Sequence, residues 1–254
     1  MPATFGSTVT RMPSQTRARE QVTNIPVLMS GDVLKDLART CWIQIEDLSP
    51  YKGLDSADQA RKTKAAHYAS VYLLLKGQFT RCYDCAAVLA WMQLRGWGMA
   101  PGETASLFAT VHGCCENGSP IGQFVLGYMY GFLGPIFWEE CSCELGEVGR
   151  NKSEAIRLFM LAQQSEFMRP TASFFLGLVH ELDSNISAAK AAFEHCLEHP
   201  LALWSLSNCQ TDVRRATALK AEANQLGYQR VKDVYFYFHG RGTGYHTANF
   251  ATFS

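Results

Sequence analysis

A small residue followed four positions later by Leu-Gly occurs twice in the middle of this chain. Gly122 precedes Leu126-Gly127, and Ala172 precedes Leu176-Gly177. Between the two motifs lies Ser153–Ala162, an apolar segment with a different helical pattern. A motif that recurs in this way indicates helix-turn-helix units, each too small to bury its own apolar face, that stack on one another. We therefore expect an array of antiparallel helix pairs.

The same template fits four units between residues 81 and 228. The marker leucines are at positions 89, 126, 176 and 206, which gives spacings of 37, 50 and 30 residues. The long spacing predicts an insert at 132–150 in the second unit. The second helix of each unit has its own small and apolar residues at helical spacing, and we expect them to face the core. These residues are Ala105, Leu107, Phe108 and Val111; Ala155, Leu158, Phe159 and Ala162; Ala189, Ala192, Phe193 and Cys196; and Ala216, Leu219 and Ala223.

Residues 31–80 predict an atypical capping unit in front of the array. Gly31-Asp32 starts a helix in which Val33, Leu34, Leu37, Cys41 and Ile45 recur at helical spacing. A second helix is expected over 57–76, with Ala66, Ala69, Leu73 and Leu74 on its inner stripe and Gly77 at its end.

The two ends of the chain differ from the repeats. Residues 1–30 contain arginines, serines and threonines without an apolar core, which favours a disordered tail over a targeting segment. Residues 229–254 hold a strand-like aromatic run, 231–238, and then a glycine-rich stretch. We expect the aromatic run to cap the last repeat.

The order of these residues resembles the Sel-1-like repeat family, a relative of the tetratricopeptide repeats. The second unit carries the resemblance best, with Gly122, Leu126-Gly127, Met129-Tyr130, Ala155, Leu158-Phe159 and Ala162. The fourth unit departs from the pattern, because Ser207 stands where glycine belongs. The resemblance implies an all-α, right-handed α-solenoid of stacked helix-turn-helix repeats with short irregular tails. It also implies a non-enzymatic adaptor or scaffold with no cofactor and no family-wide catalytic residues.

Charge and hydropathy argue against nucleic-acid binding and against a membrane span. Lysine plus arginine and aspartate plus glutamate number 23 each, so the basic excess typical of nucleic-acid binding is missing. No apolar run is long enough to predict a membrane span. The nine cysteines occur without a secretory signal, which indicates reduced thiols. A cytoplasmic location is expected, with a mitochondrial one as the alternative if residues 1–30 are a transit peptide.

The first helix of each unit would line the concave side of such a solenoid. Positions just before and two after the marker leucines need not be used for packing within the unit. They form an apolar and aromatic stripe: Val88, Trp91, Val125, Tyr128, Phe175, Leu178, Ser205 and Asn208. Exposed stripes of this kind mark partner sites, so we expect a groove for a protein or peptide segment. The alternative is that these side chains pack between neighbouring units or beneath the C-terminal tail.

Four cysteines form a weaker candidate site. Cys82 and Cys85 start one helix, and Cys114 and Cys115 end its antiparallel partner, so all four are expected at one end of a single helix pair. This placement would suit a zinc ion or redox chemistry. Adjacent cysteines seldom ligate one ion with good angles, and a buried thiol also serves as a compact apolar group. Packing is therefore the favoured interpretation.

Overall fold

The computed structural model describes residues 30–46, 66, 69–72, 75, 82–95, 104–133 and 150–229. Within these ranges the chain forms helices and no strand, so the predicted all-α class is confirmed. The helices are α1 (Gly31–Glu46), α3 (Tyr83–Arg95), α4 (Thr104–Glu116), α5 (Pro120–Phe132), α7 (Lys152–Ala162), α8 (Arg169–Leu182), α9 (Ile186–Phe193), α10 (Pro200–Asn208) and α11 (Val213–Gln225).

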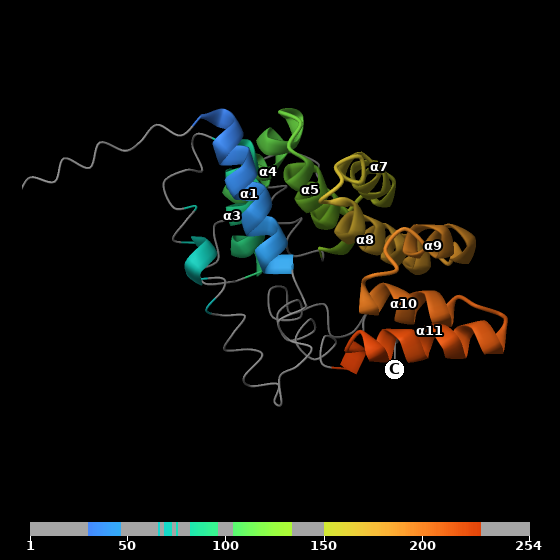
Figure 1. Ribbon diagram of the computed structural model, residues 1–254. Helices are drawn as coiled ribbons and strands as arrows, with labels where there is room; N and C mark the ends of the chain where they lie inside the picture. Colours follow the sequence, from blue (N-terminus) through green and yellow to red (C-terminus); the bar gives the residue numbers. More distant parts are fainter. Residues whose placement is uncertain are drawn as a thin grey trace, which may run out of the picture.

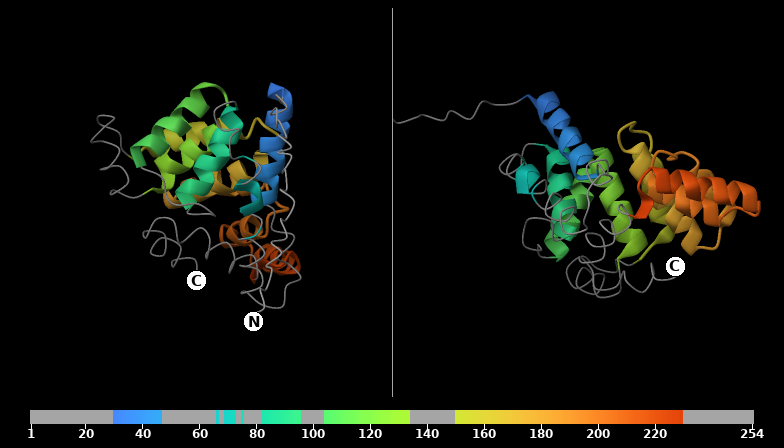
Figure 2. Two further views of the ribbon diagram at one scale, coloured as in Figure 1. Left: turned by 90° about the vertical axis from the view of Figure 1, so that its left-hand side faces the viewer. Right: turned by 60° about the horizontal axis from the view of Figure 1, so that its bottom comes forward.

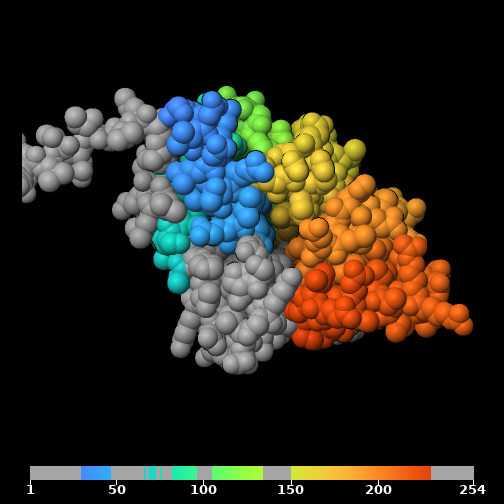
Figure 3. Space-filling view, viewed as in Figure 1, coloured from blue at the N-terminus to red at the C-terminus, as the bar shows by residue number. Residues whose placement is uncertain are grey.

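The helices pack in the order in which they follow one another along the chain. Helices α3 and α4, α5 and α7, α8 and α9, and α10 and α11 form four antiparallel pairs, and each pair packs on the next. Helix α1 packs on α3, ahead of the first pair. The pairs follow an arc from α1 to α11 (Figure 1), and the two rotated views agree (Figure 2). In the space-filling view the colours of successive units occupy successive bands (Figure 3). Packing of each pair on the next is what a stacked repeat array requires.

Side-chain caps and glycines set the ends of these helices. Ser119, Asn151, Asn185 and Asp212 each accept a hydrogen bond from a backbone N–H in the first turn of the helix that follows. Such a cap satisfies one of the donors that a helix leaves open at its start. Gly118 and Gly227 have φ angles of 75° and 83° where two helices end, a conformation that glycine adopts without strain.

The glycines of the Leu-Gly motifs mark the closest approach of the two helices in a pair. A Cβ atom on Gly127 would lie 3.2 Å from Leu158 Cβ on α7. A Cβ atom on Gly177 would lie 2.3 Å from Cε1 of Phe193 on α9. The same motif position therefore meets the second helix in both units, which explains why the motif recurs.

The inner faces of the second helices were predicted well. All the expected residues of α4, α7 and α9 are buried, together with Cys196 after α9 and Ala223 of α11. Ala216 and Leu219 of α11 are half-buried. Helix α10 begins at Pro200, and proline is well suited to the first position of a helix.

The expected inner stripes of the capping unit need correction. Val33 is half-exposed, whereas Trp42 and Ala38 of the same helix are buried. In the second expected helix, Ala66 and Ala69 are exposed, and Val71 and Leu75 are buried instead. In this second helix the larger apolar side chains, and not these two alanines, face the core. Leu73 and Leu74 lie outside the described residues.

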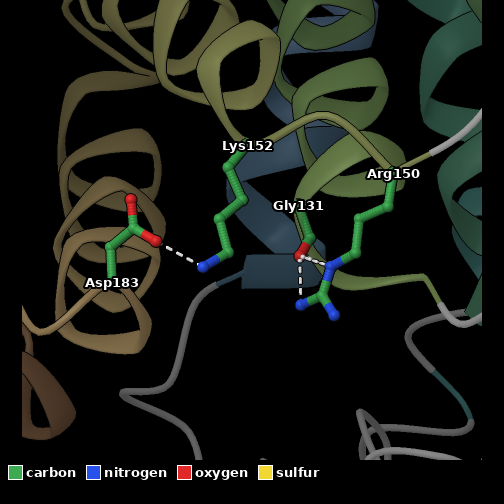
Figure 4. A network of polar contacts seen from close by, with 4 residues as sticks. All are labelled: Gly131, Arg150, Lys152 and Asp183. Carbon is green, nitrogen blue, oxygen red and sulfur yellow. Dashed lines mark hydrogen bonds and ion pairs between the residues drawn. The ribbon is translucent and has the colours of Figure 1, made fainter.

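The chain re-enters the array after the insert through two consecutive anchors (Figure 4). Both Nε and Nη2 of Arg150 donate to the Gly131 carbonyl near the end of α5, at 3.2 and 3.0 Å. The Lys152 ammonium pairs with Asp183 at the end of α8. The first contact ties α7 to its own pair, and the second ties it to the next. Residues 134–149 of the insert, the tail 1–29 and the aromatic segment 231–238 lie outside the described residues.

Candidate functional site

The predicted concave stripe is part of the core and does not face water. Val88, Trp91, Val125, Tyr128, Phe175, Leu178 and Ser205 are all buried, and only Asn208 is exposed. The prediction of an open groove at these positions is therefore wrong for seven of the eight, and packing between units accounts for the aromatic ones.

The physical reason is an aromatic column that runs across the first helices. Trp42 of α1 lies 6.1 Å from Trp91 of α3, measured between ring centroids. The Trp91 ring lies 4.9 Å from Tyr128 of α5, which in turn lies 5.6 Å from Phe175 of α8. The last two contacts are edge-to-face, the geometry that aromatic pairs favour. Trp91 Nε1 also donates to Glu46 Oε1 at 3.1 Å, so its polar end is satisfied by α1.

A buried guanidinium completes this column. Arg95 is only 2% exposed, and its Cζ lies 4.6 Å from the ring centroids of both Trp91 and Tyr128. Its Nη1 donates to the Tyr128 hydroxyl at 2.6 Å. Burial raises the pKa of Tyr128, and the charge of Arg95 opposes part of that rise. Sequence reasoning missed this role, because an arginine in the last turn of a helix is ordinarily solvated.

The structure does bring the four candidate cysteines to one end of the first pair. Cys82, Cys85 and Cys114 are buried and Cys115 is half-buried. Among the described residues, no cluster of His, Cys, Asp and Glu has the arrangement needed to hold a metal ion. Burial is the main cause that raises the pKa of Cys114 to about 12. Burial is also the main cause that raises the pKa of Cys85.

An open cleft of about 490 Å³ lies beside these cysteines, and we call it the edge cleft. Four segments that are distant in sequence line it: the start of α1, the start of α3, the turn between α4 and α5, and the turn before α8. Its lining residues are Gly31, Lys35, Asp36, Arg39, Cys82, Tyr83, Asp84, Asn117, Gly118, Ser119, Pro120, Ser165, Glu166 and Phe167.

The arrangement of the helices explains why these segments meet. Helices α1, α3 and α5 are the first helices of successive units and begin at the same edge of the array. Ser119 holds two of these starts together, because its hydroxyl donates to Asp84 on α3 while it caps α5 through Gly122 N at 3.0 Å. The cleft is therefore a product of the stacking and not of any one unit.

Exposed aromatic and charged side chains line the cleft. Tyr83 is 53% exposed, a large value for an aromatic side chain. Arg39 places its guanidinium carbon 5.5 Å from the ring centroid of the half-buried Phe167, and thereby connects α1 to the turn before α8. Lys35 and Glu166 are exposed. None of these five residues was singled out from the sequence, although the expected stacking would have grouped the starts of the first helices.

No helix in the described ranges is long and apolar enough to cross a bilayer.

No protein-family model and no curated protein matches this chain. Among solved structures, it is similar to a Sel1 repeat protein from Oxalobacter formigenes, with 17% identity, a TM-score of 0.47, and coverage of 78% of this chain and 82% of that one. The architecture itself rests on the helices described above, which form an array of stacked helix pairs.

Proposed function

We propose that this chain is a non-enzymatic adaptor that binds a segment of another protein in the edge cleft. The observation that carries the proposal is the convergence of four segments on one open cleft with a half-exposed tyrosine at its wall. The concave stripe is not part of the proposal, because seven of its eight residues are buried.

The chemistry of the cleft favours a polypeptide over other ligands. Exposed aromatic side chains such as Tyr83 are favoured anchors for a partner protein, since they bury a large area with few rotatable bonds. The ionisable lining includes two bases, Lys35 and Arg39, and three acids, Asp36, Asp84 and Glu166. A surface that binds a nucleic-acid backbone needs an excess of basic side chains, and the described residues that line this cleft show no such excess. A peptide with charges of both signs and an apolar residue for Tyr83 fits the lining.

The test is affinity capture from the native cell with matched variants. The double variant Tyr83→Ala/Lys35→Glu changes two exposed side chains of the cleft and should keep the melting temperature of the wild type. The control is Met160→Ala, which removes an exposed side chain of α7 outside the cleft. We expect proteins captured by the wild type and by the control to be lost from the double variant. Their retention by a folded double variant would contradict the proposal.

The compartment in which the adaptor works decides between two versions of this function. A cytoplasmic adaptor retains residues 1–30, whereas an assembly factor in mitochondria would lose them as a transit peptide. The composition of the tail supports the first version. Sequencing the N-terminus of the mature protein from its native cell separates the two.

A further inference from the structure

Cys82 and Cys85 stand at the start of α3 with a spacing that is typical of redox-active pairs. Cys82 immediately precedes the helix and Cys85 lies in its first turn. The interaction between the two thiols adds to burial in raising the pKa of Cys85. Cysteines three apart at a helix start are close enough to form a disulfide.

The two thiols differ in their surroundings. Cys82 is among the residues that line the edge cleft. Cys85 is fully buried, and its Sγ donates to the Leu34 carbonyl of α1 at 3.4 Å. Cys82 is 9% exposed and Cys85 is not exposed at all, so a reagent in the cleft would meet Cys82 first.

We propose that Cys82 and Cys85 form a reversible disulfide, and that a small-molecule disulfide of the glutathione type, entering through the edge cleft, oxidises them. The pair is a modification site in its own right, and the inference does not depend on the identity of the adaptor's partner.

The reaction is a pair of thiol–disulfide exchanges. The Cys82 thiolate attacks one sulfur of the oxidant, which breaks the oxidant's S–S bond and releases one thiol with the proton of Cys82. The Cys85 sulfur then attacks Cys82 Sγ and displaces the second thiol, which takes the proton of Cys85. The protein loses two electrons and two protons, and the oxidant takes up both. The attacking role falls to Cys82, because it lines the cleft, and the resolving role to Cys85, because it is fully buried beside it.

Oxidation would change the contact between Cys85 and α1, the helix that forms one wall of the cleft. Once Cys85 is in a disulfide, its sulfur carries no proton and the hydrogen bond to Leu34 is lost. Lys35, the next residue, lines the cleft. The redox state of the pair is thereby coupled to the helix that forms one side of the cleft.

The experiment equilibrates the full chain with mixtures of oxidised and reduced glutathione, blocks the remaining thiols and maps the disulfides by mass spectrometry. We expect a Cys82–Cys85 bond that excess reduced glutathione removes completely. Cys85→Ser should stop at a glutathione adduct on Cys82, and Cys85→Ala provides a second variant should serine fail to fold. In the control Cys209→Ser, which changes a half-buried thiol outside the cleft, the Cys82–Cys85 bond should form as in the wild type.

Each other outcome overturns the proposal. Wild-type protein in which both thiols stay reduced in excess oxidised glutathione shows that the pair is structural. A bond between Cys82 and the neighbouring Cys114, or a glutathione adduct on wild-type Cys82 that never resolves, excludes Cys85 as the resolving thiol. These results are independent of the capture experiment, so failure of one proposal leaves the other distinguishable.

Discussion

Gly127 and Gly177 occupy the same position in two units, but the space beside them differs. The atom nearest a Cβ on Gly127 is at 3.2 Å, so the neighbouring helix has to give only a few tenths of an ångström. Three ring atoms of Phe193 lie 2.3 to 2.8 Å from a Cβ on Gly177, and that ring is fully buried. The same methyl group therefore has a different cost in the two units.

Gly177→Ala should destabilise the protein by up to about 2 kcal/mol, because overpacking a core costs about 1–3 kcal/mol and the higher helix propensity of alanine returns about 1 kcal/mol. In Gly127→Ala the two effects are of similar size, so its free energy of unfolding should stay within about 1 kcal/mol of the wild type. Urea denaturation of both variants measures the difference. A Gly177→Ala protein as stable as the wild type would show that Phe193 relaxes freely.

Single residues also show where prediction from the sequence stops. The Leu-Gly motif was recognisable because the close approach of two helices admits only small residues at fixed positions. Trp91 and Tyr128 were placed on an open surface because their burial depends on Trp42 and Arg95, which no repeat pattern connects to them. Tyr83 is a partner candidate only once the starts of α1, α3 and α5 are known to share an edge.

At the scale of helices, the junction of α8, α9 and α10 contains an ionisable group with an unusual environment. Burial raises the pKa of Glu181 on α8 from 4.5 to about 7. Its Oε2 has no hydrogen-bond partner in the part of the chain that the structure describes. Cys209, at the end of α10, lies at the same junction. Burial and the charge of Glu181 raise the pKa of Cys209 to about 11, and the charge of Lys190 on α9 opposes part of that rise. The folded chain therefore favours the protonated carboxyl.

Stability should fall as the pH rises from about 4.5 to about 7, because only the unfolded chain ionises Glu181 freely in that range. Glu181→Gln imitates the protonated form and should remove this loss. We expect the variant and the wild type to have equal urea midpoints near the acid end of the range, and the variant to have the higher midpoint above it. Glu198→Gln, at an exposed glutamate, is the control for removal of one charge. Parallel pH profiles for wild type and Glu181→Gln would contradict this account.

Helix boundaries were easier to predict than helix orientation. Asn185 and Pro200 mark the starts of α9 and α10 through local chemistry, which a sequence displays directly. The inner face of the helix that contains Val71 was predicted wrongly, because alanines at helical spacing fit the inner and outer faces equally well. Which face of a helix is buried depends on the neighbouring helix, and the sequence of one helix does not contain that information.

For the molecule as a whole, stacking predicts a gradient of stability. Helix α5 lies between neighbours on both sides and buries almost every residue, whereas Ala223 is the only fully buried residue of α11. Among the described residues, α11 has a neighbouring helix on one side only, and local opening of a stacked array is easiest at such a position. Amide hydrogen exchange should therefore show the highest opening free energies in α5 and clearly lower ones in α11. Equal protection of both helices would indicate a single cooperative core.

The two anchors at the end of the insert have a practical consequence. Arg150, the last residue of the predicted insert, and Lys152 hold the start of α7 through contacts to Gly131 and Asp183. Both contacts lie at the α7 end of the connection and involve no residue between 133 and 150. We expect that a foreign sequence, such as an epitope tag or a fluorescent reporter, grafted between residues 133 and 150 leaves both contacts in place, which makes this connection a candidate port for engineering.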